Sequence, residues 1–228
     1  MVPENQITPI RIKFKKYGSL MYISHLDLAR TMQRIIVRSG IDIWYSEGFN
    51  PQPKIVFAVP LPVGVESECE YMDIKINTPM PCDEISRRLS VNFPEEMKVV
   101  DVYVPDTKLK KISYIDYEIT ISSPYVEETT AQEINSLFQK DLYIIKKSKG
   151  NEKEINIREY IKSINVNYLN NNIVINTVVC SGNEKNLNPE LIIEAIKKNT
   201  GILTKSPISE LYSIIRKRML CEDLTEFK

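Results

Sequence analysis

The only histidine of this chain, His25, lies in the run SHLDL, between Ser24 and Asp27. Its imidazole changes charge near neutral pH, so it could serve as a general base or contact a phosphate. Ser46 and Glu66 could join His25 and Asp27 in a polar cluster, although residues two apart on a helix do not face each other. A histidine at a helix start can also be satisfied by a nearby backbone group or carboxylate. The sequence leaves both roles of His25 open.

Three arginines follow the histidine at intervals of four residues, at Arg30, Arg34 and Arg38. At about 100° per residue they form a stripe on one side of a helix, where guanidinium groups could bind phosphates. An amphipathic helix needs a solvated face in any case, so the stripe could also be only that. No acidic residue is interleaved with the stripe, which favours phosphate binding, and Lys54 could extend the patch.

The run EGFNPQPK, residues 47–54, indicates a stiff loop with several hydrogen-bonding groups. Gly48 can adopt a positive φ, whereas Pro51 and Pro53 restrict the backbone and remove two donors. Asn50 offers both a donor and an acceptor. A rigid loop beside a helix N-terminus is a candidate site for an anion or another ligand. The alternative is a connection that needs stiff geometry and binds nothing.

A helix must position the histidine and the arginines. Ser24 is a good N-cap with Asp27 three residues later, and the helix is predicted to run to Ser39 and to stop at Gly40. Its apolar positions gather on the side opposite the arginines. These positions are Leu28, Ala29, Met32, Ile35 and Ile36.

The hydrophobic periodicity predicts a mixed fold with the same order of elements in both halves. In the first half, strands are expected at 11–17, 41–46, 55–61, 70–76 and 97–104, and helices at 24–39 and 82–90. After a linker at 105–112, strands are expected at 113–122 and 142–147, a helix at 129–140 capped near Thr129 or Thr130, a hairpin at 164–179 turning at Asn171-Asn172, and a helix from Asn188 to Gly201. The tail 206–220 suits a helix by its apolar spacing, whereas a repeat of the first half requires a strand.

The predicted fold class is α+β, with two tandem ferredoxin-like (βαββαβ) units. The first, residues 1–108, carries the SHLDL and GFNPQP motifs, and the second covers residues 109–228. One sheet face of the first unit should be free of helices. Alternation places basic and aromatic residues there, and such a face can bind RNA. These residues are Lys13, Lys15, Tyr71 and Lys75, and Arg11 is expected to point to the same side as Lys13 and Lys15.

Composition limits the partners and the compartment. Lys and Arg number 30 and Asp and Glu number 30, so the net charge is zero and any attraction to nucleic acid must come from a local patch. The four cysteines are far apart and form no CxxC pair, so we expect no metal site and free thiols in a reducing cytoplasm. No run of about 18 apolar residues occurs, so no membrane-spanning helix is expected.

The stretch from Gly18 to Ile74 resembles an uncharacterised radical-SAM-associated protein family. The resemblance rests on SHLDL, arginines along the helix, S-x-GFNP-x-P, P-L-P-x-G and E-S-x-x-E. The matching residues are Ser24, His25, Leu26, Asp27, Leu28, Arg30, Arg34, Ser46, Gly48, Phe49, Asn50, Pro51, Pro53, Pro60, Leu61, Pro62, Gly64, Glu66, Ser67 and Glu70. The candidate substrate-binding residues are Ser24, His25, Asp27, Arg30, Arg34, Arg38, Ser46, Gly48, Phe49, Asn50, Pro51, Pro53, Lys54, Glu66, Ser67 and Glu70.

The resemblance implies a radical SAM protein as partner and a role beside RNA or ribosome metabolism. Such a partner would hold S-adenosylmethionine and an iron–sulfur cluster, which needs three closely spaced cysteines. The cysteine spacings here exclude that cluster, so this chain is expected to bind no cofactor and to act as an accessory that recognises or positions a substrate. The alternative is a metal-independent endoribonuclease similar to CRISPR repeat-processing enzymes, with His25 as the base. Against it, the glycine-rich loop of that superfamily is missing near the C-terminus.

Overall fold

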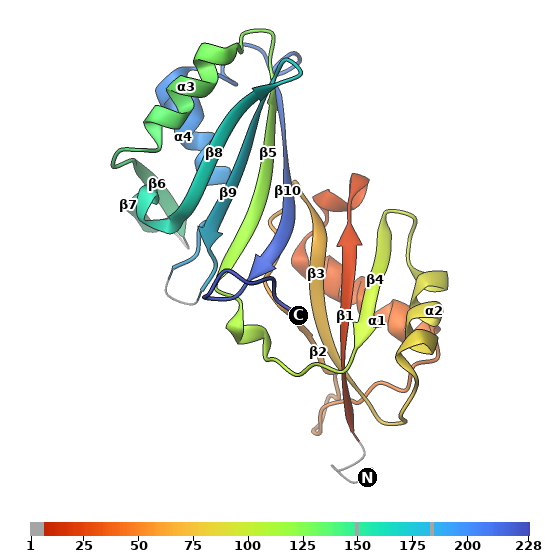
Figure 1. The fold of residues 1–228 in the computed structure, drawn as a ribbon. Coiled ribbons are helices and arrows are strands. Elements are labelled where there is room, and N and C mark those ends of the chain that lie inside the picture. The colour runs from red at the N-terminus through yellow and green to blue at the C-terminus, as the bar shows by residue number, and fades with distance from the viewer. Residues whose placement is uncertain (1–6, 149–150, 183–184) are drawn as a thin grey trace. The chain divides into compact units, whose positions relative to one another are not determined.

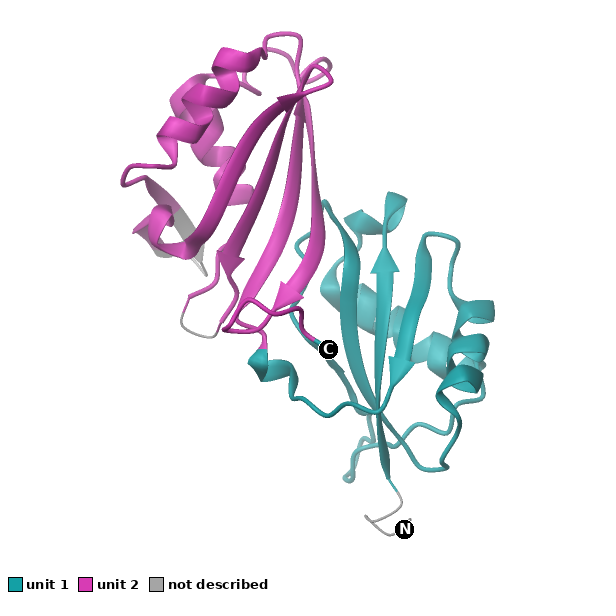
Figure 2. Ribbon diagram, in the orientation of Figure 1, with its two compact units in different colours: residues 1–111, 228 teal, residues 112–227 magenta. Residues whose placement is uncertain are grey.

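The computed structural model describes residues 7–148, 151–182 and 185–228. The chain has a mixed α+β fold that divides into two compact units (Figure 2). The first contains residues 1–111 with Lys228, and the second contains residues 112–227. The sequence places this division between residues 108 and 109. No helix within the described residues is long and apolar enough to cross a membrane.

The first unit is an antiparallel sheet with two helices on one side (Figure 1). Its sheet has the strand order β4-β1-β3-β2. In chain order the elements are β1 (Thr8–Lys16), α1 (His25–Arg38), β2 (Ile55–Phe57), β3 (Val65–Ile76), α2 (Cys82–Asn92) and β4 (Met97–Tyr103). A single hydrophobic core joins the helices to the sheet. It includes Ile12, Phe14, Met32, Ile36, Met72, Ile74, Ile85 and Leu89.

Helix α1 begins and ends where the sequence predicts. The Ser24 hydroxyl accepts a hydrogen bond from the Asp27 backbone N–H at 3.1 Å, which satisfies one of the free donors at the helix start. Gly40 follows the helix with a φ of +64°, a conformation that glycine adopts without strain. The cap and the stop together fix both ends of the helix that carries the arginine stripe.

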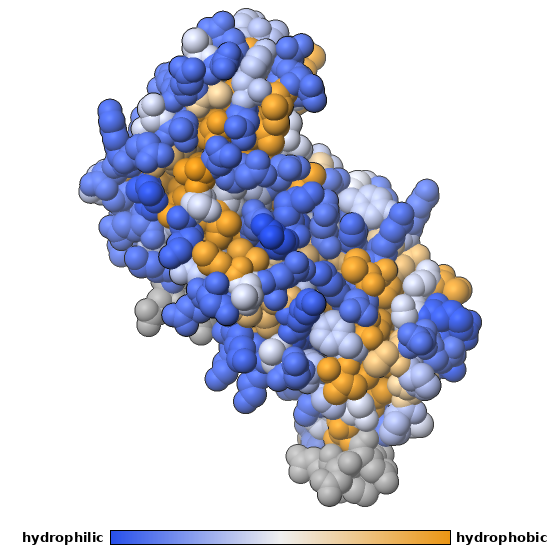
Figure 3. Space-filling view, viewed as in Figure 1, coloured by the Kyte–Doolittle hydropathy of each residue, from blue (hydrophilic) through white to orange (hydrophobic). Residues whose placement is uncertain are grey.

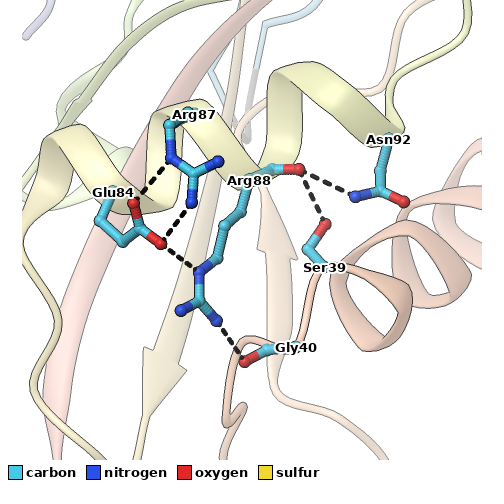
Figure 4. A network of polar contacts seen from close by, with 6 residues as sticks. All are labelled: Ser39, Gly40, Glu84, Arg87, Arg88 and Asn92. Carbon is cyan, nitrogen blue, oxygen red and sulfur yellow. Dashed lines mark hydrogen bonds and ion pairs between the residues drawn. The ribbon is translucent and has the colours of Figure 1, made fainter.

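A polar network holds the end of α1 against α2 (Figure 4). Glu84 accepts hydrogen bonds from Arg87 and from the Nε of Arg88, the latter at 2.6 Å. Arg88 also donates from Nη1 to the carbonyl of Gly40 at 3.0 Å, and the Ser39 hydroxyl donates to the carbonyl of Arg88 at 3.3 Å. These bonds position the last turn of α1 and therefore Arg38.

Two strands predicted in the first unit are wrong in extent. Residues 41–46 form no strand and make only isolated bridges, Ile43 with Ile76 and Tyr45 with Pro53. A proline cannot donate a ladder hydrogen bond, so pairing at Pro53 does not extend into a strand. The strand predicted at 55–61 is limited to β2, Ile55–Phe57.

The sheet face opposite the helices differs from the solvated basic face that was predicted. Arg11 is 0% exposed and Tyr71 is 1% exposed, so both predictions of an outward position in solvent were wrong. Arg11 is satisfied by Asp73 and Thr107, and the Lys13 ammonium lies 5.4 Å from the centre of the Tyr71 ring. Figure 3 shows hydrophobic residues among hydrophilic ones over β1 and β4 on the side turned to the viewer.

In the second unit, four strands pair antiparallel in the order β10-β5-β9-β8. Both helices of this unit lie on one side of that sheet (Figure 1). Its elements are β5 (Tyr114–Ser122), α3 (Glu128–Leu137), β6 (Tyr143–Ser148), β7 (Asn151–Asn156), β8 (Ile161–Leu169), β9 (Asn172–Cys180), α4 (Glu190–Thr200) and β10 (Leu211–Leu220). Strands β6 and β7 pair with each other as a separate two-stranded sheet.

The elements of the second unit differ from prediction mainly at their boundaries. Glu127 caps α3 in a capping box with Thr130, in place of a cap at Thr129 or Thr130. The β8–β9 hairpin turns at Asn170 and Asn171, with φ of 49° and 61°, one residue before the predicted pair. Strand β7 begins at Asn151, and residues 149–150 lie outside the described residues.

The ambiguous tail contains a strand, β10, which pairs with β5 along its whole length. Gly201 ends α4 in the left-handed conformation, as predicted, with a φ of 69°. The N-cap of α4 is Pro189, and the side chain of Asn188 accepts a hydrogen bond from the Glu190 N–H at 3.2 Å. The Asn188 side chain therefore still satisfies a donor at the helix start.

Candidate functional site

The arginine stripe lies on the exposed side of α1, because Leu28, Met32 and the other apolar positions of the helix face the core. Arg30 forms a 3.7 Å ion pair with Asp27, and both side chains are 60% exposed. Within the part of the chain that the structure describes, Arg34 and Arg38 form no ion pair or hydrogen bond through their side chains. Two guanidinium groups are therefore available for an external anion.

The segment from Trp44 to Lys54 forms a narrow hairpin. The Lys54 N–H donates to the Trp44 carbonyl at 3.0 Å, and the Ser46 N–H donates to the Gln52 carbonyl at 2.8 Å. The Ser46 hydroxyl accepts a further bond from the Gln52 N–H at 3.0 Å. The Trp44 N–H donates to the Lys75 carbonyl at 2.7 Å, which ties the base of the hairpin to β3. Ser46 thus stabilises the hairpin through both its backbone and its side chain.

The tip of this hairpin presents an aromatic side chain to solvent. Gly48 has a φ of +127°, which only glycine adopts readily, and Phe49 beside it is fully exposed, at 109%. The Asn50 side-chain oxygen accepts a hydrogen bond from the Gln52 amide at 3.2 Å, and Pro51 restricts the backbone between them. A fully exposed phenylalanine on a stiff tip is a feature that packing does not require.

A hollow of about 650 Å³ lies between the exposed side of α1 and the hairpin. Its lining combines arginines with an aromatic ring and apolar surface. The lining residues are Thr31, Gln33, Arg34, Val37, Arg38, Tyr45 and Pro53. Tyr45 pairs with Pro53 through an isolated bridge, so the wall of the hollow has a fixed backbone. Cations beside an aromatic ring suit a ligand that carries both phosphate and a flat base.

His25 lies apart from this hollow. Its ring contacts Phe57 edge-on, with centroids 5.1 Å apart and planes at 80°, and its side chain is exposed. Ser24 and Asp27 bond to each other at 2.7 Å, from hydroxyl to carboxylate. Within the described residues no hydrogen bond joins His25 to Asp27 or Ser46. The structure therefore does not assemble the predicted polar cluster around the histidine.

The E-S-x-x-E residues belong to β3 and not to a turn beside the hairpin. The Glu66 carboxylate accepts a hydrogen bond from the Gly18 N–H at 2.8 Å, which anchors the turn after β1. Ser67 is buried, and its hydroxyl accepts from the Cys69 N–H at 3.2 Å. Glu70 is 2% exposed. These three residues shape the sheet, and none of them lines the hollow beside Arg34 and Arg38.

The structure thus brings together Arg34, Arg38 and Pro53, and places Phe49 at the tip of the hairpin that walls the hollow. Tyr45 was missed by the sequence reasoning. It precedes the S-x-GFNP motif directly, and its position in an alternating run could have been used to place it opposite Trp44.

A protein-family profile described as "Uncharacterized protein conserved in bacteria (DUF2344)" matches residues 9–189. The chain belongs to this uncharacterised bacterial family, DUF2344. The matched segment includes α1, the hairpin and every strand of the first unit's sheet. No curated protein matches the chain.

Two solved structures are similar to the DUF2344 chain at low identity. One is a chain in the "Crystal Structure of a Cbf5-Nop10-Gar1 Complex", with 10% identity and a TM-score of 0.48 over 92% of this chain and 48% of that chain. This chain thus spans about half of that one. The other is an unknown protein from Galdieria sulphuraria, with 7% identity and a TM-score of 0.26 over 91% and 97% of the two chains. Neither TM-score reaches 0.5, so neither likeness supports an assignment of activity or partner.

Proposed function

We propose that this DUF2344 protein binds single-stranded RNA through its first unit and presents it to a radical SAM enzyme. The observation that carries the proposal is the hollow of about 650 Å³ in which two uncommitted arginines, Arg34 and Arg38, face an aromatic residue, Tyr45. Phe49, fully exposed at the hairpin tip, adds a stacking surface at the edge of the same site.

Single-stranded RNA matches this arrangement in both of its chemical parts. Guanidinium groups bind phosphate oxygens in a bidentate manner, and they carry no sequence information by themselves. Unstacked bases of single-stranded RNA stack on exposed aromatic rings, which contributes about 1–3 kcal/mol for each base. Since the net charge of the chain is zero, such a local patch is what would attract RNA.

We also propose that both units are ferredoxin-like modules. Each has the element order βαββαβ, if the β6–β7 hairpin of the second unit is counted as an insertion. Each sheet then has its fourth strand beside the first, followed by the third and the second, and all neighbours are antiparallel. This arrangement supports a module that holds its binding residues on a rigid frame.

The radical SAM partner is supported by the family resemblance of the SHLDL, GFNP and E-S-x-x-E motifs. In this proposal the partner supplies S-adenosylmethionine and the iron–sulfur cluster, and this chain supplies substrate recognition. Size-exclusion chromatography of the chain mixed with a radical SAM protein from the same organism tests the association. Two separate peaks at micromolar concentrations would contradict it.

Fluorescence anisotropy with a labelled single-stranded RNA tests the binding surface. Affinity should fall steeply when salt is raised from about 50 mM to about 200 mM, since phosphate contacts release counterions. The double variant Arg34→Ala/Arg38→Ala should bind at least about tenfold more weakly and with a shallower salt dependence. Lys198→Ala, an exposed cation on α4 of the second unit, is the control and should retain parental affinity. Equal affinities of parent and double variant would refute the assignment.

A further inference from the structure

A second cavity of about 550 Å³ lies in the first unit, on the other side of the Trp44–Lys54 hairpin. Pro53 lines the arginine hollow, whereas the next residue, Lys54, lines this second cavity. Adjacent residues of an extended segment point to opposite sides, so the hairpin separates the two spaces. The volume lies within the range of about 300–1,000 Å³ that is typical of small-molecule sites.

The cavity carries an excess of positive charge. Lys54, Lys75 and Lys108 line it, all three side chains are exposed, and within the described residues none of them is ion-paired. The carboxylate of Asp73, which also lines it, is bound by Arg11 through two hydrogen bonds of 2.7 and 2.8 Å. Only the Asp106 carboxylate is left to offset the three ammonium groups.

The rest of the lining is apolar. Val56 on β2 is 46% exposed, and Ile74 is buried beneath the cavity. Pro105 and Leu109, from the segment after β4, supply the opposite wall. An apolar surface of this kind binds a hydrocarbon or aromatic body, while lysines act as point charges that attract an anion without fixing its geometry.

The segment after β4 that forms one wall of the cavity is held in place by the buried side chain of Arg11. The Arg11 guanidinium donates from Nη1 to the Thr107 hydroxyl at 3.0 Å and from Nη2 to the Thr107 carbonyl at 2.9 Å. Arg11 also bonds the Lys228 carbonyl at 3.2 Å. The cavity is therefore bounded on this side by a segment that hydrogen bonds from Arg11 hold in place.

We propose that this cavity binds a small organic anion with an apolar body, such as an aromatic or branched carboxylate or phosphate ester. The acidic group lies among Lys54, Lys75 and Lys108, and the apolar body lies against Val56 and Leu109. The proposal does not depend on RNA binding, because it rests on a different cavity and on different side chains.

The test uses 8-anilinonaphthalene-1-sulfonate, an anion with an aromatic body, and its neutral analogue N-phenyl-1-naphthylamine. Binding is read from the emission of each probe and from energy transfer out of Trp44, the only tryptophan. Trp44 lies 5.4 Å from the Nζ of Lys75, measured to its ring centre. The transfer therefore reports binding close to the Trp44–Lys54 hairpin, and the variants below assign it to this cavity.

The double variant Lys54→Gln/Lys75→Gln should bind the anionic probe about tenfold more weakly, since two ammonium groups each contribute a modest attraction. The neutral probe should change by less than about twofold. Lys98→Gln, an exposed lysine of β4, is the control and should leave both probes unaffected. Val56→Asp, which places a carboxylate on the apolar wall, should abolish the binding of the anion.

Three outcomes overturn the proposal: no saturable binding by the parent, unchanged binding by the double variant, or equal loss of both probes. Displacement of the anionic probe by phenylacetate is then compared with its displacement by phenyl phosphate. The stronger competitor shows whether the cavity prefers a carboxylate or a phosphate ester. Arg34→Ala/Arg38→Ala, the variant that tests RNA binding, should bind the anionic probe as the parent does. The two proposals can therefore fail separately.

Discussion

Arg11 on β1 donates two parallel hydrogen bonds to Asp73 on β3, from Nε to Oδ1 at 2.7 Å and from Nη2 to Oδ2 at 2.8 Å. The two residues face each other directly in the register of the strands. Burial lowers the pKa of the Arg11 guanidinium, but the hydrogen bonds and charge of Asp73 outweigh burial, so that pKa is raised above its ordinary value. The arginine therefore stays charged inside the unit, where its charge needs this partner.

Replacing Asp73 by Asn should destabilise the first unit by about 2 kcal/mol or more, because a buried guanidinium loses its charged partner. The measurement is urea unfolding followed by Trp44 fluorescence, which reports this unit alone. Glu95→Gln, an exposed carboxylate on the same unit, is the control and should change the stability by less than about 0.5 kcal/mol. Equal effects of the two substitutions would contradict the role given to the pair.

Tyr71 should make the first unit sensitive to alkaline pH. Burial raises the pKa of its phenol from 10.0 to about 12, although the nearby Lys13 ammonium opposes the shift. A raised pKa contributes stability that is fully present below the unfolded value of 10.0 and is lost as the pH rises towards 12. Parent protein should therefore lose about 2 kcal/mol more than Tyr71→Phe over this window.

Urea unfolding of both proteins near the two ends of that window checks the prediction for Tyr71. The comparison cancels the other tyrosines, which both proteins retain. Parallel losses of stability in the two proteins would show that Tyr71 ionises without unfolding the unit.

The Glu84 network should act at the opposite end of the pH scale. Hydrogen bonds from Arg87 and Arg88 lower the pKa of the Glu84 carboxyl from 4.5 to about 2. A lowered pKa contributes stability above the unfolded value of 4.5, and this contribution disappears as the pH falls towards 2. The Tm of Glu84→Gln should lie below that of the parent at neutral pH, and the gap should close in acid. Glu133→Gln, an exposed residue of α3, should show no gap at either pH.

Phe49 should contribute to RNA binding and not to stability. Its side chain is fully exposed, so Phe49→Ala should change the free energy of unfolding by less than about 0.5 kcal/mol. Loss of a stacked base should weaken the binding of single-stranded RNA about tenfold, and Phe49→Trp should restore it. Ile208→Ala removes another highly exposed apolar side chain and should leave anisotropy titrations unchanged. A drop in affinity for Ile208→Ala as large as for Phe49→Ala would indicate that RNA binds nonspecifically to exposed apolar side chains.

His25 should behave as a packing residue. Its edge-on contact with Phe57 is worth about 1 kcal/mol, so His25→Ala should lower stability by roughly that amount. Its ring lacks a carboxylate partner among the described residues, so we do not expect it to act as a base in RNA cleavage. RNA incubated with the parent or with His25→Ala should therefore remain uncleaved. RNA cleavage by the parent that disappears in His25→Ala would revive the alternative of an endoribonuclease.

The sequence correctly predicts those elements whose ends are determined by residues close to them in the chain. Ser24 and Gly40 delimit α1 because a cap and a left-handed stop act within one turn of the chain. The tail could not be decided in this way. Leu211, Ile215 and Met219 are spaced as on a helix, and the strand forms because β10 pairs with β5, about ninety residues or more away in the sequence. Long-range pairing of this kind leaves no local signature.

The sequence indicates several residues of the candidate site, but it does not show which of them lie together in the structure. The sequence singles out Arg34, Arg38 and the 47–54 loop, and the structure places Arg34, Arg38 and Pro53 around one hollow. The motif run gives no indication that Glu66 anchors Gly18 or that Glu70 is buried, because alternation shows which residues share a face and not what covers it. Burial of Arg11 likewise depends on a partner, Asp73, sixty-two residues away.

The Trp44–Lys54 hairpin restricts how this family can vary in length. Its rungs, Ser46 with Gln52 and Trp44 with Lys54, enclose the tip, so residues added between Gly48 and Pro51 would lengthen only the arm that carries Phe49. One residue inserted between Gln52 and Lys54 would instead exchange the sides to which Pro53 and Lys54 point. Both cavities would then change in a single mutational step. Natural length variation should therefore be confined to the tip, and the two surfaces should evolve as a linked pair.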